Sequence, residues 1–119
     1  MGSLKDFTEL EVWIASKKLT NTVYKVTEQF PQKENYRLTD QMCRAAVSIP
    51  SNIAEGIGRN TNPDKKRFLY IARGSAFELE TQAHIAYDLN YLNDESFKKI
   101  KSEILSVKKL INGFISYLK

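Results

Sequence analysis

Cysteine and histidine are almost missing from this chain, with one of each among 119 residues. A single cysteine, Cys43, cannot form a disulfide within the chain or build a cysteine-rich zinc site, and it is typical of a reducing compartment. We therefore expect a cytoplasmic protein. A single histidine, His84, excludes the metal motifs that need two. No metal and no cofactor are expected.

Long apolar runs are also missing. No stretch of about 18 apolar residues is present to span a bilayer, and the first residues lack the apolar segment of a secretory signal. The composition, 42% hydrophobic and 27% charged, is that of a globular protein. A chain of this length predicts a single domain over residues 1–119. The missing apolar runs predict that the protein has no membrane partner.

The residue patterns of common catalytic sites are absent as well. The glycine-containing "GIGRN" lacks the Lys-Ser or Lys-Thr of a phosphate-binding loop. Glu78 and Glu80 are two residues apart, so they lie on different faces of a helix and do not form an acid/base pair there. Cys43 falls on an apolar strip, where a buried and unreactive thiol is expected. We expect no enzymatic activity and no catalytic residues.

Prolines and turn residues divide the chain into four helical segments. The first is predicted over about residues 9–29, with Thr8 and Glu11 at the spacing of a capping box. The second is predicted to begin after Thr39.

The third segment is predicted to follow Asn62, which caps it ahead of Pro63, and to end near Leu92. The fourth is predicted to begin near Asp94. No segment alternates with a period of two, so strands are not expected. Four helices joined by short links predict an all-α, antiparallel up-down-up-down four-helix bundle.

Each segment carries apolar or small residues at helical spacing, the pattern of a face turned to a shared core. The first segment presents Val12, Ser16, Leu19, Val23, Val26 and Phe30. The third presents Phe68, Leu69, Ala72, Ser75, Ala76, Leu79, Ala83 and Ala86, and the fourth presents Phe97, Ile100, Ile104, Val107, Ile111, Phe114 and Leu118.

The second segment keeps one helical phase through a proline, which predicts a single helix kinked at Pro50. Proline has no N–H and leaves the carbonyl of Ala46 without its helix partner. Ser48, Ser51 or Asn52 are the expected substitutes for the freed backbone groups. The residues that keep the phase are Met42, Ala45, Ala46, Ile49, Ile53 and Ile57.

A second apolar strip lies beside this face and makes the helix apolar over about half its circumference. A helix of a monomeric bundle buries only one stripe, so the surplus predicts a subunit contact in a homo-oligomer. The alternative is that a central helix is simply well buried among its three neighbours. The strip consists of Cys43, Val47, Pro50 and Ala54.

The remaining flank of the same segment is a continuous polar ridge. One interpretation makes it a structural hydrogen-bond network at a helix interface; the other makes it part of a ligand or nucleic-acid surface. The ridge consists of Gln41, Arg44, Ser48, Asn52, Glu55 and Arg59.

Aromatic rings recur every seven residues in the third segment, on the side opposite the predicted core. They are interpreted either as a subunit interface, where aromatics are enriched, or as a stacking platform for bases with Lys66 and Arg73 nearby. The four rings are Tyr70, Phe77, His84 and Tyr91.

Basic residues exceed acidic ones by four, and they are unevenly spread: residues 74–97 hold five acids and no Lys or Arg, whereas residues 98–119 hold six lysines and one acid. Such an excess favours a polyanion partner, although most lysine-rich faces are merely solvated. The candidates for phosphate contact are Arg44, Arg59, Lys65, Lys66, Arg67, Arg73, Lys98, Lys101, Lys108 and Lys109.

Three stretches resemble one known family: "LEVWIASKKL", "FPQKENYRLTDQMCRAAVSIPSNIAEGIGR" and "FLYIARGSAFELETQAHIAYDLNYL". They are similar to the four-helix-bundle proteins encoded in 23S ribosomal RNA intervening sequences. The resemblance implies a homopentamer with a central channel. A related group, the accessory variability proteins of diversity-generating retroelements, is similar in fold and engages a reverse transcriptase and nucleic acid. By that analogy, RNA and such a protein are expected partners.

Two functions remain open from the sequence. The first is a homo-oligomeric bundle that binds RNA or another polyanion through basic surface residues. The alternative is a protein-interaction scaffold without a role in nucleic-acid binding, in which the outward aromatics and the polar ridge hold another protein and the basic face serves solubility.

Overall fold

Four long helices make up most of the described chain. The structure is a computed structural model that describes residues 6–119, so residues 1–5 of the predicted domain lie outside it. No strand occurs in the described part, and the predicted all-α class is confirmed. The helices are α1 (Glu11–Thr27), α2 (Leu38–Ile57), α3 (Asn62–Asp88) and α4 (Asp94–Tyr117), with short 3-10 helices η1 (Phe7–Glu9) and η2 (Gln32–Glu34) before α1 and α2.

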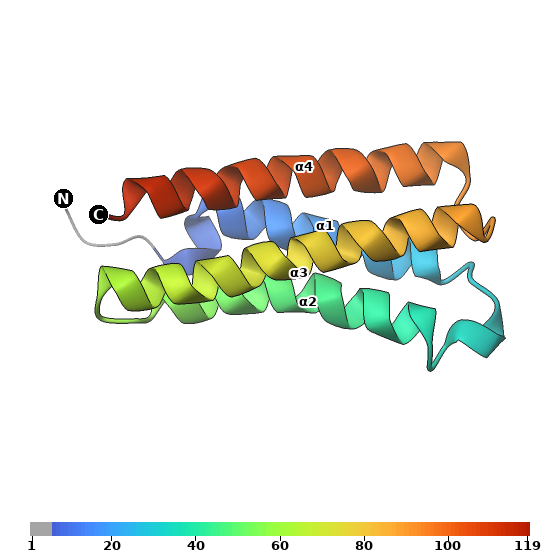
Figure 1. Ribbon diagram of the computed structural model, residues 1–119, viewed down its shortest axis with the longest axis horizontal. Coiled ribbons are helices and arrows are strands. Elements are labelled where there is room, and N and C mark those ends of the chain that lie inside the picture. The colour runs from blue at the N-terminus through green and yellow to red at the C-terminus, as the bar shows by residue number, and fades with distance from the viewer. Residues whose placement is uncertain (1–5) are drawn as a thin grey trace.

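The helices lie side by side along the long axis of a body measuring 48 × 25 × 20 Å (Figure 1). α1 and α3 each pack against both α2 and α4. Bonds between neighbouring helices join residues that lie at similar distances from the link between the two helices. The Thr27 hydroxyl meets the Cys43 thiol, for example, and Arg73 meets Asn112 on α4. Figure 1 likewise shows the chain reversing direction at each link.

The core forms from the predicted faces of the helices. Gly56 on α2 allows α3 to come close, because a Cβ added at Gly56 would lie 3.0 Å from the Cβ of Phe68. Phe68, Ser75 and Phe97 are only partly buried. The fully buried side chains include Leu19, Val23, Met42, Ala46, Ile49, Ile53, Ala72, Ala76, Leu79, Ala83, Ala86, Ile100, Ile104, Val107 and Ile111.

The prediction that Thr8 caps the first helix is wrong. Thr8 does not cap α1, because it lies in η1, where its backbone N–H donates to the Asp6 carboxylate at 2.9 Å. Leu10 takes the cap position of α1 without a side-chain bond.

The third helix is also capped differently from the prediction. Thr61, not Asn62, caps α3, because its hydroxyl accepts from the backbone N–H of Asp64 at 3.3 Å. Asn62 is already helical, and its amide donates to the carbonyl of Lys119 at the far end of the chain.

α3 ends four residues before the predicted boundary. Asn90 adopts φ 64°, a left-handed conformation that asparagine tolerates better than most residues. The N–H of Tyr91 then donates to Ala86 and that of Asn90 to Tyr87, the bond pair that closes a helix C-terminus. Tyr91 is therefore not part of the helical row of rings.

α2 runs unbroken through Pro50, as its apolar phase predicts; a bend there stays a prediction. The freed carbonyl of Ala46 is satisfied from another helix: the hydroxyl of Thr20 on α1 lies 2.9 Å from it. The prediction that Ser48, Ser51 or Asn52 would do this is wrong for that carbonyl. Asn52 donates instead to the backbone oxygen and hydroxyl of Ser48.

A buried carboxylate holds the link that precedes α2. Glu34, only 5% exposed, accepts from the N–H of Leu38 at 3.2 Å and from the Tyr91 hydroxyl at 3.0 Å. The backbone bond from Leu38 holds the pKa of Glu34 below its usual value, against the opposing effect of burial, and Tyr91 adds to the lowering. Glu34 thus ties the start of α2 to the end of α3.

The lowered pKa makes the stability depend on pH in a defined direction. The ionised form of Glu34 stabilises the fold above the ordinary glutamate pKa of 4.5, and this contribution is lost as the pH falls through the lower folded-state value. We expect Glu34→Gln to be less stable than wild type at pH 7 in urea unfolding, with the difference shrinking below about pH 4.5. Glu28→Gln, on an exposed glutamate, is the control. A constant difference across this range would contradict the assignment.

Candidate nucleic-acid interface

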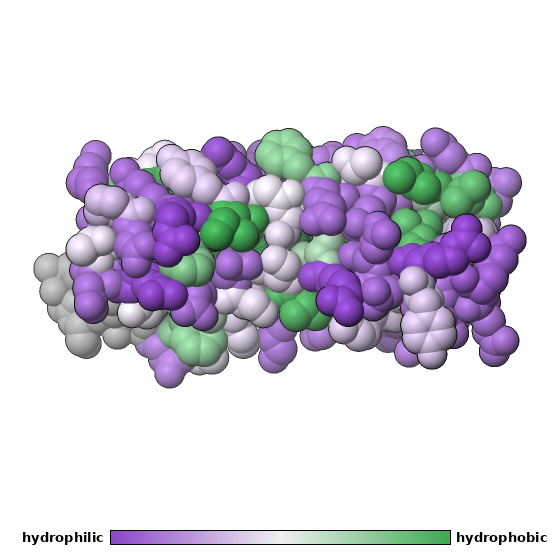
Figure 2. Space-filling model, turned by 60° about the horizontal axis from the view of Figure 1, so that its bottom comes forward, coloured by the Kyte–Doolittle hydropathy of each residue, from purple (hydrophilic) through white to green (hydrophobic). Residues whose placement is uncertain are grey.

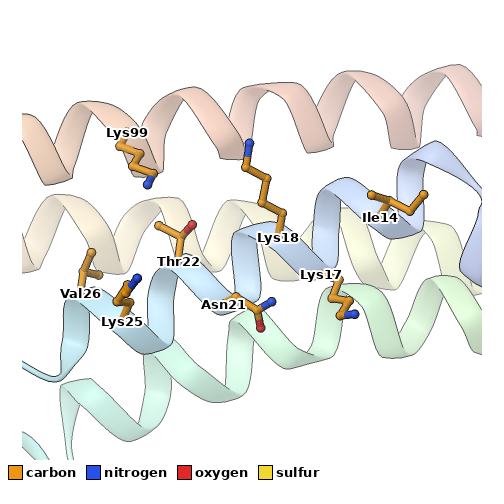
Figure 3. Close-up of a pocket in the computed structure, with 8 residues that line it drawn as sticks. All are labelled: Ile14, Lys17, Lys18, Asn21, Thr22, Lys25, Val26 and Lys99. Atoms are coloured by element: carbon orange, nitrogen blue, oxygen red, sulfur yellow. The ribbon is translucent and has the colours of Figure 1, made fainter.

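A lysine-lined hollow of about 400 Å³ opens on the surface between α1 and α4 (Figure 3). Four of its eight lining residues are lysines, three from α1 and one from α4. Figure 3 shows Lys18 extending from α1 toward α4, and Lys99 lying on α4 above Thr22 and Val26. The lining residues are Ile14, Lys17, Lys18, Asn21, Thr22, Lys25, Val26 and Lys99.

The hollow, named here the lysine hollow, has no negative charge of its own. None of the described residues that line it is acidic. Lys18, Lys25 and Lys99 make no ion pair or hydrogen bond within the described chain, and Lys17 lies 5.4 Å from the ring of Trp13. Ammonium groups gathered without a counter-ion attract an anion.

The periodicity of α1 and α4 explains the position of these lysines. On α1, Lys18 and Lys25 are seven residues apart, and seven residues complete nearly two helical turns, so both lie on one side. That side flanks the buried face formed by Leu19 and Val23. On α4, Lys99 precedes the buried Ile100.

Sequence analysis missed the lysine hollow, because it counted lysines over stretches of chain. Residues 1–32 carry four lysines and four acids, so the lysines of α1 did not appear as an excess in that count. The sequence pattern that could have revealed the lysine hollow is the grouping of Lys17, Lys18 and Lys25 on one side of α1, away from the buried Val12 and Val23.

Several predicted phosphate-contact residues are engaged within the chain around the α2–α3 link. Arg59 pairs with Glu55 at 2.9 Å, and Arg67 pairs with Asp64. Both guanidinium groups lie over the ring of Phe68. Lys65 donates to the backbone oxygens of Ile57 and Arg59, and Arg44 pairs with Asp40 at 3.0 Å.

Three more of these residues join α3 to α4. Lys108 donates to Glu80 at 2.8 Å and Lys101 does so at 3.3 Å, and the bond from Lys108 is the main cause of a lowered pKa of Glu80. Lys101 also lies 3.0 Å from His84 Nε2. Arg73 donates to Asn112 and lies over the ring of Tyr70.

Lys66, Lys98 and Lys109 are the remaining predicted contacts, and none of them makes a polar bond to another described residue. Lys98 and Lys109 are exposed on α4, whereas Lys66 is partly buried in the first turns of α3. The structure therefore brings free lysines together on α1 and α4 and leaves Lys66 apart from them.

The apolar strip predicted on α2 lies at the surface beside α1. Val47, Pro50 and Ala54 line a shallow groove of about 330 Å³ together with Trp13 and residues of both helices. Val47 is 39% exposed, and Cys43 is partly buried against the core with its thiol 3.6 Å from the Thr27 hydroxyl. The strip is thus only partly covered by the chain's own helices.

The row of rings on α3 divides into two parts. Tyr70 and Phe77 are about half exposed, and His84 is exposed. Tyr91 packs against the core and lies 5.3 Å from the ring of Phe30. On the face that Figure 2 shows, hydrophobic residues form separate patches among polar ones.

The polar ridge of α2 contains both a buried contact and exposed pairs. The Ser48 and Ser75 hydroxyls lie 2.8 Å apart between α2 and α3, and Asn52 donates to Ser48. Glu55 is exposed in its pair with Arg59, and Gln41 is exposed. This arrangement favours the structural interpretation of Ser48 and Asn52.

Two further kinds of site do not occur among residues 6–119. No cluster of three or more His, Cys, Asp or Glu side chains is arranged there to hold a metal ion. No helix in this range is long and apolar enough to cross a membrane.

The fold and its lysine hollow define an all-α four-helix-bundle protein with a basic surface site. The chain belongs to the 23S rRNA-intervening sequence protein family, whose model matches residues 8–113. This confirms the resemblance stated from the sequence. No curated protein matches the chain.

One solved structure extends the comparison to three dimensions. It is a protein of unknown function from the S23 ribosomal protein family of Bacteroides thetaiotaomicron. The TM-score is 0.79 at 22% identity, over 87% of this chain and 97% of that chain. At this identity the likeness shows a shared fold.

Proposed function

We propose that this protein is a non-catalytic homo-oligomeric bundle that binds RNA through the lysine hollow. The observation that carries the RNA part is the set of four lysines between α1 and α4, which have no acidic neighbour in the lining. Binding there would release counter-ions from the RNA, which is the main source of affinity for a basic surface. The family name refers to 23S rRNA, so fragments of that RNA are the first ligands to test.

A salt titration tests RNA binding. Four lysine–phosphate contacts predict a log–log slope of about −2.8 to −3.6, so raising the salt from 50 to 200 mM should weaken binding about 50- to 150-fold. Affinity that does not change with salt would rule out phosphate contacts as the source of binding.

The homo-oligomer part of the proposal is supported by two different apolar surfaces on one chain. One is the α1–α2 groove around Val47, and the other is the exposed face of α3 around Tyr70 and Phe77. A groove on one copy and protruding rings on the next form a head-to-tail contact, which closes into a ring when the rotation between successive copies adds up to a full turn. The family resemblance implies five copies.

Single charged substitutions test this contact. We expect Val47→Asp and Phe77→Asp each to give monomers in solution-mass measurements, because each places a carboxylate in the apolar contact. A mixture of the two variants retains one intact contact per pair and should give dimers. Ser102→Asp, on the exposed side of α4, should keep the wild-type mass. A monomeric wild type would overturn the proposal and leave the α3 face for a different protein, the scaffold function.

A further inference from the structure

Resting on the proposed function, we infer that the lysine hollow binds the phosphate backbone of double-stranded RNA and does not read the bases of a single strand. The inference follows from which side chains the hollow contains and from how its charges are spread over two helices.

The described lining residues lack the aromatic rings on which a single strand is held, and Asn21 and Thr22 are the uncharged side chains among them that can bond a base edge. Proteins that hold single strands stack the bases on aromatic rings, and no ring lines the lysine hollow. Tyr24, the half-exposed ring of α1, is not among the lining residues. Arginine, whose planar fork reads guanine, is also absent from the lining. Lysine is a flexible point charge that attracts phosphate without fixed geometry.

The charges are spread over a length that suits a duplex. Lys18 and Lys25 are about 10 Å apart along α1, at 1.5 Å per residue, and Lys99 adds a charge from α4. At the spacing of double-stranded DNA, one charge per roughly 1.7 Å of axis, about six phosphates of a duplex fall within 10 Å, against about half that number for one strand. Because the lysine hollow takes its lysines from two helices that lie side by side, it can contact both strands of a duplex.

The site's position also favours a rigid ligand. The lysine hollow lies on the outside of two packed helices, where Lys18 extends from α1 toward α4 and Lys99 lies on α4 (Figure 3). The fixed backbone of a duplex presents its charges without losing conformational freedom on binding, whereas a single strand must be ordered first.

The test compares a 20-base-pair RNA duplex of mixed sequence with each of its separated strands, designed not to fold, at 0.1 M salt. We expect the duplex to bind at least tenfold more tightly, a scrambled duplex to bind equally well, and Tyr24→Ala to leave both affinities unchanged. Lys18→Gln with Lys25→Gln should remove most of the duplex preference.

The outcomes separate the inference from the proposed function. Equal or tighter binding of the single strand, discrimination between duplex sequences, or a loss of affinity in Tyr24→Ala would overturn the inference and leave RNA binding intact. Failure to bind either form would overturn both.

Discussion

Replacing Lys18, Lys25 and Lys99 together with glutamine is expected to weaken RNA binding about 100-fold at 0.1 M salt. Each lysine–phosphate contact adds about 0.7 to 0.9 to the salt slope, which at 0.1 M relative to 1 M salt is about 0.7 to 0.9 log units of affinity, so three contacts amount to roughly two factors of ten in the dissociation constant. These three side chains have no partner in the described chain, so their replacement leaves the bundle's own contacts in place. The log–log salt slope should become shallower by about two to three.

The control is a triple variant with the same loss of charge outside the lysine hollow: Lys33→Gln, Lys66→Gln and Lys119→Gln. Its affinity should stay within a few fold of wild type. If both triple variants lose the same affinity, net charge alone explains binding, and the lysine hollow is not the site. Helical circular dichroism of each variant confirms that the bundle is intact.

Thr20→Val is expected to destabilise the fold by about 1–3 kcal/mol in urea unfolding, the cost of a buried polar group without a partner. The orphan is the carbonyl of Ala46, a fully buried residue whose helix donor is missing because residue 50 is proline. The Thr20 hydroxyl lies 2.9 Å from this carbonyl and 2.9 Å from the carbonyl of Ser16. The Ser16 carbonyl already accepts a backbone hydrogen bond within α1. The bond to Ala46 is therefore the one that matters.

A double-mutant cycle isolates this bond. In a Pro50→Ala background the N–H of residue 50 can donate to Ala46, so Thr20→Val should cost less than about 1 kcal/mol. Thr81→Val is the matched control, because its hydroxyl bonds an exposed carbonyl within α3. All variants are compared at one protomer concentration. Equal costs in the two backgrounds would show that Thr20 does not compensate for the proline.

The fold was predictable from sequence because apolar periodicity reports burial directly. The regular stripe from Ile100 to Ile111 and the continuous phase across Pro50 both survive in the structure. Helix ends were less predictable, since Thr61 and Asn62 are both good caps and only the backbone conformation distinguishes them. The left-handed turn at Asn90 was likewise not visible in the pattern.

The candidate site was harder to predict than the fold. A basic residue in a sequence carries no sign of whether it is already paired. Lys108 pairs with Glu80, which is far away in the sequence, and only the packing of α3 on α4 shows this pair. Arg59 pairs with Asp64 across the α2–α3 link, and only the packing of α2 on α3 shows that one. The lysine hollow combines Lys25 with Lys99, residues that come together only when α1 and α4 pack.

Lysine acylation with and without RNA, read by mass spectrometry, tests most directly whether phosphate is held between α1 and α4. The measurement reports each side chain separately in the unaltered protein. We expect bound RNA to slow the acylation of Lys18, Lys25 and Lys99 strongly, while Lys66 at the start of α3 reacts as in the free protein. Unchanged acylation of the three lysines in a saturated complex, or protection confined to Lys66 and the α2–α3 link, would contradict this account.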